Sequence, residues 1–183
     1  MEKPEIYTLR LAGVERKLKV LEVAPGISLP SFVMLGDTEL IEDVAEALFK
    51  KLPRDNIEYL VCPEAKAIPL THALAVRLGV NYVVLRKSVK AYMRNPLIEK
   101  TKSITTTEEQ QLVLNGSDCE KLRGKKVCII DDVVATGGSL RSIEKLLERT
   151  GCIVTAKAAA LLEDAGYKGD DLIFLQHHPI FRD

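Results

Sequence analysis

The stretch "VCIIDDVVATGGSLRSIEKLLE" at residues 127–148 decides the fold class of this chain. It joins an apolar strand directly to two acids, Asp131 and Asp132, and then to a glycine-containing turn and an amphipathic helix. In open α/β sheets, ligands bind at the carboxyl ends of the strands, and the two acids lie at such an end. The stretch therefore predicts a strand–turn–helix unit with a binding site at its junction.

The turn after the acids, Ala135 through Ser139, has the features of a phosphate-binding site. Free N–H groups at a helix N-terminus, together with the helix dipole, favour an anion. Gly137 and Gly138 let the backbone approach that anion closely, and the hydroxyl of Thr136 or Ser139 can donate to it. Carboxylates would repel a phosphate but accept hydrogen bonds from hydroxyl groups. The two halves together predict a sugar phosphate as the ligand.

The rest of the chain alternates strand patterns with helix patterns, which predicts one α/β domain over residues 1–183. Its mostly parallel sheet should be flanked by helices. No P-loop and no G-x-G-x-x-G dinucleotide motif is present. The expected strands are 57–62, 82–86, 126–131, 153–163 and 172–176, and the expected helices are 38–52, 68–78 and 139–150.

The N-terminal region and the middle of the chain are expected to lie outside this pattern. Residues 1–36 should form a hairpin over 5–23, followed by a loop over 24–36, with the α/β core at 37–183. Residues 87–110 have few apolar side chains, so we expect mostly a long exposed loop, with a short strand at 111–114.

Composition narrows the class of protein. The chain has 183 residues, is 46% hydrophobic and carries equal numbers of acidic and basic side chains. A net charge of zero argues against a nucleic-acid or membrane-surface partner. The first residues lack a long apolar run, and the four cysteines form no C-x-x-C pair. These features predict a cytoplasmic protein with reduced thiols.

The pattern at residues 127–139 resembles the phosphoribosyl-pyrophosphate signature of type I phosphoribosyltransferases: an apolar strand, two acids, two mostly apolar residues and A-T-G-G-S/T. The resemblance implies the fold of that family, with an N-terminal hood over the base. It implies that Asp131 and Asp132 hold the ribose hydroxyls as the catalytic carboxylates. The residues that would bind the 5′-phosphate are Ala135, Thr136, Gly137, Gly138 and Ser139.

Two further segments resemble the pyrophosphate-binding loops of the family. In "VCPEAKAIPL" (61–70), Glu64, Ala65 and Lys66 take the positions of an E-S-R-G type loop, with Ala67 in place of its glycine. An ordinary connection between strand and helix is the alternative. In "LRKSVKAY" (85–92), the family's R-K-x-x-K entry to a flexible loop is matched, although such cations can also be solvated surface charges. The matching cations are Arg86, Lys87 and Lys90.

The hood and the signature together imply a base pocket. Leu29 and Phe32 could pack on one face of a purine and Val133 on the other, although Phe32 is better explained as core. The "HHP" at 177–179 is expected at the surface or at a subunit contact.

The resemblance implies a pentosyltransferase of purine salvage that uses phosphoribosyl pyrophosphate and a purine base and works as a homodimer. Mg²⁺ would bind through the pyrophosphate of the donor, and no side chain is assigned as a metal ligand. Adenine is the first choice of base. The alternatives are xanthine, suggested by "KSITTT" at 102–107, and guanine or hypoxanthine. Pyrimidine use and a non-catalytic sensor of phosphoribosyl pyrophosphate also stay open.

Overall fold

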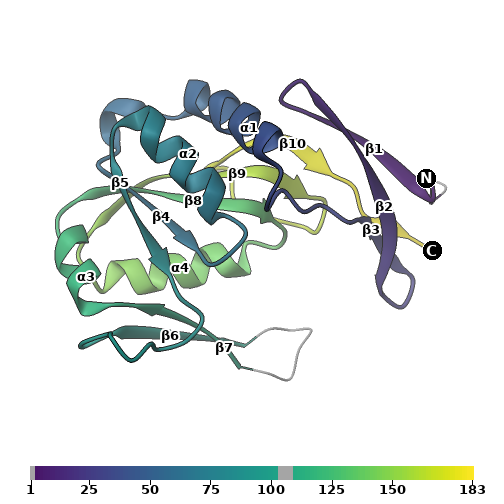
Figure 1. Cartoon of the computed structure of the whole chain (residues 1–183). Coiled ribbons are helices and arrows are strands. Elements are labelled where there is room, and N and C mark those ends of the chain that lie inside the picture. The colour runs from purple at the N-terminus through teal and green to yellow at the C-terminus, as the bar shows by residue number, and fades with distance from the viewer. Residues whose placement is uncertain (1–2, 103–108) are drawn as a thin grey trace.

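The structure is a computed structural model that describes residues 3–102 and 109–183. Its centre is a five-stranded sheet with the order β10-β9-β8-β4-β5, in which every neighbouring pair is parallel (Figure 1). The predicted fold class, a mostly parallel sheet flanked by helices, is confirmed. The strands are β4 (Tyr59–Pro63), β5 (Asn81–Leu85), β8 (Lys126–Val134), β9 (Ile153–Glu163) and β10 (Leu172–His178).

Helices cover both faces of this sheet (Figure 1). On one face, α1 (Thr38–Lys51) and α2 (Ile68–Leu78) pack with the N-terminal hairpin in one hydrophobic cluster. On the other face, α3 (Gly116–Leu122) and α4 (Gly138–Glu148) share a second cluster. A short 3₁₀ helix spans Arg54–Asn56. The sequence does not predict α3, because a helix this short shows no clear apolar period.

A second, four-stranded sheet forms the N-terminal hood, in the order β1-β2-β3-β11. The predicted hairpin is confirmed as β1 (Ile6–Leu11) and β2 (Val14–Ala24). The predicted loop over 24–36 is wrong in part, because β3 (Ile27–Pro30) pairs with β2 and with β11 (Phe181–Arg182). Tertiary pairing makes a strand of a segment that Pro and Gly mark locally as a loop.

His178 joins this hood to the core, so the expectation that "HHP" lies at the surface is wrong for this residue. Its side chain is 1% exposed, and its Nε2 lies 2.8 Å from the carbonyl oxygen of Pro30. The ring also contacts those of Tyr7 and Phe32. Burial lowers the pKa of His178, so the neutral imidazole fills this position as a packing residue.

The predicted long loop over 87–110 is also wrong in part. β6 (Leu97–Lys102) pairs antiparallel with β7 (Glu109–Leu114), and residues 103–108 between them lie outside the described residues. Arg149, the C-cap residue of α4, holds this hairpin in place. Its guanidinium donates a hydrogen bond to the carbonyl oxygen of Ile98 in β6 at 2.7 Å. Charged and threonine side chains mask the strand pattern in this segment.

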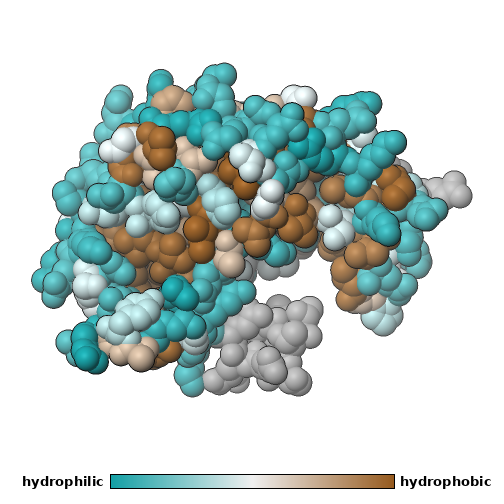
Figure 2. Space-filling model, viewed as in Figure 1, coloured by the Kyte–Doolittle hydropathy of each residue, from teal (hydrophilic) through white to brown (hydrophobic). Residues whose placement is uncertain are grey.

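One face of the molecule is hollowed between the core and the hood (Figure 2). Exposed hydrophobic side chains occur on the hood and beside it, including Leu21, Val23, Val33 and Leu35. Among the described helices, none has the length and apolar character needed to cross a bilayer.

Candidate active site

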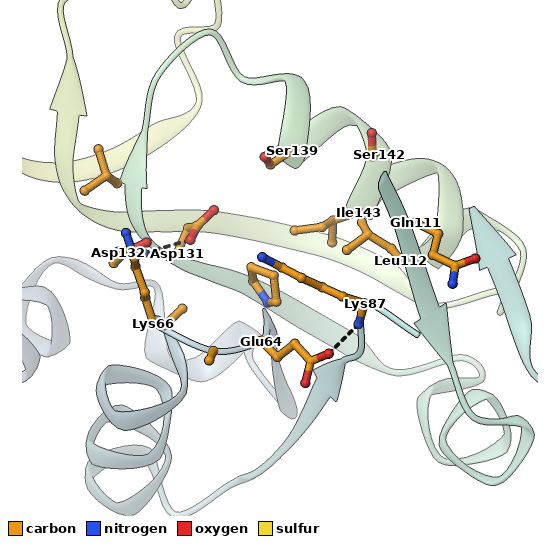
Figure 3. Close-up of a pocket in the computed structure, with 14 residues that line it drawn as sticks. Glu64, Lys66, Lys87, Gln111, Leu112, Asp131, Asp132, Ser139, Ser142 and Ile143 are labelled. Atoms are coloured by element: carbon orange, nitrogen blue, oxygen red, sulfur yellow. Dashed lines mark hydrogen bonds between the residues drawn. The ribbon is translucent and has the colours of Figure 1, made fainter. Parts of the chain in front are cut away.

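The candidate site lies where the strand order of the parallel sheet reverses. β5 lies on one side of β4, whereas β8 lies on the other. A cavity of about 470 Å³ opens at the carboxyl ends of β4 and β8 (Figure 3). Such a switch point is the usual ligand site of an open α/β sheet. Its walls come from residues 63–67, Lys87, residues 131–133, three residues of α4 and two of β7.

Asp131 and Asp132 are buried residues in the second half of β8, and both line this cavity. Their exposed fractions are only 7% and 8%, and the N–H of Asp132 donates to Oδ1 of Asp131 at 2.9 Å. Burial, and next the charge of Asp132, raise the pKa of Asp131 well above its usual range, while Lys66 opposes the rise. Figure 3 shows the Lys66 side chain reaching toward this pair. The two acids therefore suit a ligand that brings hydroxyl donors or positive charge.

This burial predicts that Asp131 lowers the stability of the fold at neutral pH. In the unfolded chain Asp131 loses its proton near pH 4, whereas in the folded chain its raised pKa keeps the proton bound to higher pH. The free energy of unfolding therefore falls as pH rises above about 4. Asp131→Asn should therefore raise Tm at pH 7 by a few degrees, and the gain should vanish as pH falls toward 4. Thermal melts across this range measure it. Exposed Asp55 supplies the control Asp55→Asn, and a lower Tm for Asp131→Asn at pH 7 would contradict the prediction.

The predicted phosphate turn lies beside the acids and leads into α4. Gly137 is the N-cap of α4 at φ +76°, a conformation that favours glycine, and it has no side chain to cap the helix. No acidic residue occupies the first turn. Ser139 lines the cavity, whereas residues 135–138 form the turn next to it. The N–H groups at this helix start are therefore available to an anion.

A second helix begins at the same cavity. The connection from β4 to α2 supplies Glu64, Ala65, Lys66 and Ala67 to the wall. Ala67 has φ −77° and ψ −13°, which any residue adopts, so the alanine in place of the family's glycine causes no backbone strain. Two helix N-termini therefore face one cavity, which suits a ligand with two separate anionic groups.

Glu64 is already paired within the site. Its carboxylate accepts from Nε of Arg86 at 2.6 Å and from the N–H of Lys87 at 2.5 Å. Burial opposes ionisation of Glu64, but these donors and their charge outweigh it and hold its pKa below the usual value. The Glu64 side chain therefore ties the β4–α2 connection to the end of β5.

The predicted pyrophosphate cations take different positions. The side chain of Lys87 extends across the cavity (Figure 3). Arg86 pairs with Glu64 and also donates to the hydroxyl of Tyr92 at 3.2 Å. The ammonium of Lys90 donates to Ser88 at 2.6 Å. Lys66 and Lys87 are thus the cationic side chains that line the cavity, while Arg86 and Lys90 lie outside its lining.

The predicted base pocket is brought together only in part. Val133 lines the cavity, but Leu29 and Phe32 are not among its lining residues. Leu29 pairs with Leu21 between β2 and β3. Phe32 is 7% exposed and belongs to the hydrophobic core, as its alternative interpretation expected.

Four lining residues do not follow from our sequence interpretation. Ser142 and Ile143 lie three and four positions after Ser139, on the same face of α4, so helical spacing could have found them. Gln111 and Leu112 come from β7. Only the packing of the β6–β7 hairpin against the core brings them to the cavity, and no local signal predicts it.

Comparison with known proteins decides the family. The model of the phosphoribosyl transferase domain matches residues 33–177, most of the chain. The chain belongs to this phosphoribosyltransferase family. The predicted resemblance to type I phosphoribosyltransferases of the purine branch is confirmed.

The relatives of this phosphoribosyltransferase carry two different names. A hypoxanthine/guanine phosphoribosyltransferase of Methanothermus fervidus is 32% identical over 136 residues, which cover 74% of this chain and 68% of that protein. An adenine phosphoribosyltransferase of Clostridium beijerinckii is 30% identical over 164 residues, which cover 86% of this chain and 90% of that protein. The crystal structure of adenine phosphoribosyltransferase from Thermoanaerobacter pseudethanolicus superposes on this structure with a TM-score of 0.67 and 25% sequence identity. The superposition covers 94% of this chain and 95% of that chain. The percentage identities of these relatives therefore do not distinguish adenine from hypoxanthine or guanine.

Proposed function

We propose that this enzyme transfers the 5-phosphoribosyl group of phosphoribosyl pyrophosphate to a ring nitrogen of a purine base and releases pyrophosphate. One observation carries the proposal. A buried acid pair, two helix N-termini and two lysines converge on a single cavity at the switch point of the sheet. These are complementary to the hydroxyls and the two anionic ends of the donor.

Each end of the donor has its own residues in this proposal. The turn at 135–139 binds the 5′-phosphate through backbone N–H groups and the hydroxyl of Ser139. Asp131 and Asp132 accept hydrogen bonds from the ribose hydroxyls. The pyrophosphate lies against the start of α2, with Lys66 and Lys87 as its cations. Arg86 acts through Glu64, which it holds in place.

The carboxylates also suit the charge that develops during transfer. As the bond from C1 of the ribose to pyrophosphate breaks, the ribose carries positive charge. The purine nitrogen bonds to C1 and loses its proton to solvent. Asp131 and Asp132 are placed in advance to stabilise that charge, and their buried position strengthens the interaction. Electrons of the broken bond leave with pyrophosphate, next to the two lysines.

Mg²⁺ fits this site as part of the bound donor. Two adjacent carboxylates are the hard oxygen ligands that the ion prefers. Burial, and next the charge of Asp132, raise the pKa of Asp131, and a cation nearby would oppose that rise. The described residues contain no cluster of three or more acidic, histidine or cysteine side chains able to hold a metal, so most ligands would come from the pyrophosphate and water. The ion would supply neutralisation of the leaving group.

Adenine is the proposed base. The similarity to adenine phosphoribosyltransferases extends over more of the chain, 86% and 88% in two clostridial proteins, than the 74% shared with the M. fervidus hypoxanthine/guanine enzyme. The second candidate is hypoxanthine or guanine, because those relatives are equally similar where they align. The "KSITTT" segment that suggests xanthine falls mainly on residues outside the described ones.

Release of pyrophosphate tests both the reaction and the base. Phosphoribosyl pyrophosphate and Mg²⁺ are supplied with adenine, guanine, hypoxanthine, xanthine, uracil or orotate in turn. We expect release with adenine, and release with another purine alone would correct the base. Binding of the donor without release with any base would instead support a sensor, and absence of binding would contradict the proposed site.

We further propose a cytoplasmic homodimer, as the family resemblance implies. The exposed hydrophobic residues on the hood and beside it would supply apolar surface to such a contact. Sedimentation equilibrium distinguishes the dimer from the 20.3 kDa monomer.

A further inference from the structure

Next to Gly137 of the phosphate turn lies a cluster of charged residues that the proposed reaction does not use. Lys157 of β9 is only 9% exposed and donates to Glu144 of α4 at 2.7 Å. Its ammonium also lies 2.6 Å from Oδ2 of Asp171, the residue before β10. Lys157 thus joins α4 to the connection between β9 and β10.

Tyr167 connects this cluster to the phosphate turn, because it contacts both Asp171 and Gly137. Its hydroxyl donates to Oδ1 of Asp171 at 3.0 Å, so both oxygens of that carboxylate are bound. The ring lies directly on Gly137, where an added Cβ would be 2.6 Å from two ring carbons. The hydroxyl end lies against Gly169, where an added Cβ would collide with it. The ring is therefore held between two glycines, one of which is the N-cap of the phosphate-binding helix.

We propose that Tyr167, fixed by Asp171 and Lys157, is a positioning residue that holds the Gly137 turn in its anion-binding conformation. The inference rests on the proposed function, because it assumes that this turn takes the 5′-phosphate of the donor. Tyr167 and Asp171 are not among the residues lining the site cavity and act through the backbone of the turn. A shift of the turn would misalign its N–H groups with the phosphate, and small displacements of this kind have large effects.

This arrangement predicts a loss confined to one end of the donor. In Tyr167→Ala, the Kd of ribose 5-phosphate should rise about tenfold or more, because that ligand needs the turn. The Kd of pyrophosphate, which binds at the start of α2, should stay unchanged. Calorimetry measures both. The KM for phosphoribosyl pyrophosphate should rise together with the Kd of ribose 5-phosphate, while the KM for the base should stay the same.

Three further variants keep the test decisive if Tyr167→Ala folds poorly. Gly169→Ala displaces the ring without altering it and should reproduce the selective loss. Tyr167→Phe and Asp171→Ala remove the same hydrogen bond, so their double variant should weaken the binding of ribose 5-phosphate no more than Asp171→Ala alone. Tyr59→Ala is the matched control, because Tyr59 packs on the same hydrophobic cluster but begins β4, away from the cavity.

The outcomes separate the inference from the proposed function. Equal loss of both ligands, or no loss of either, would overturn the positioning role. The same selective loss in Tyr59→Ala would also overturn it, because any weakening of the cluster would then suffice. Failure of the unaltered protein to bind ribose 5-phosphate and pyrophosphate would overturn the proposed function, and this inference with it.

Discussion

Replacing both Asp131 and Asp132 with asparagine should lower kcat/KM for phosphoribosyl pyrophosphate by about 100- to 1,000-fold. Asparagine keeps the shape of each side chain but removes its charge, so the developing positive charge on the ribose loses its stabilisation. Only one oxygen per side chain remains to accept from the ribose hydroxyls. The effect should appear in both kcat and KM, because the acids contact the donor before and during transfer.

Steady-state kinetics with the preferred base measure this loss. Asp55→Asn, an exposed acid before β4, should leave both constants unchanged. Since Asp131→Asn is expected to raise Tm, the double variant should remain folded, which separates loss of activity from loss of structure. If the double variant had the same kcat and KM as the unaltered protein, the proposed role of Asp131 and Asp132 in the reaction would be wrong.

Gly137→Val should abolish detectable binding of ribose 5-phosphate and lower kcat/KM by about 100-fold or more. Position 137 has φ +76°, which costs a side-chain-bearing residue about 1–2 kcal/mol. The new Cβ would also meet the Tyr167 ring at 2.6 Å and the guanidinium of Arg141 at 3.2 Å. The turn cannot keep its conformation against both, so its N–H groups move away from the phosphate.

The chain offers a matched control for this substitution. Gly124 has a similar φ of +70°, but nothing lies within 4 Å of an added Cβ. It precedes β8, whereas the site lies at the end of that strand. Gly124→Val should therefore lose stability from the backbone alone and keep its kinetics. If Gly137→Val bound ribose 5-phosphate as the unaltered protein does, the turn would not be the phosphate site.

Local sequence patterns predict the sheet and the site residues of β8 because the residues that determine them are consecutive in the chain. The apolar strand, the acids and the glycine turn occupy residues 127–139, and each element fits the next. The same holds for α1 and α2, whose ends carry an Asp37 cap and a left-handed Gly79. In these elements, local propensity and tertiary structure agree.

The remaining features depend on contacts between distant segments. β3 is a strand because β2 and β11 pair with it, and His178 is buried because the hood covers it. Gln111 and Leu112 reach the cavity through the β6–β7 hairpin, whose charged sequence suggests a loop. The support of Gly137 by Tyr167 joins residues that no local spacing relates.

The hood sheet also constrains the order in which the molecule can be assembled during synthesis. β1 and β2 are adjacent and can pair as soon as both have left the ribosome. β3 finds its second neighbour only in β11, and the bond between His178 and Pro30 spans 148 positions. Closing so long a loop is slow compared with forming a hairpin. The hood should therefore dock last, after the parallel sheet and its phosphate turn are in place.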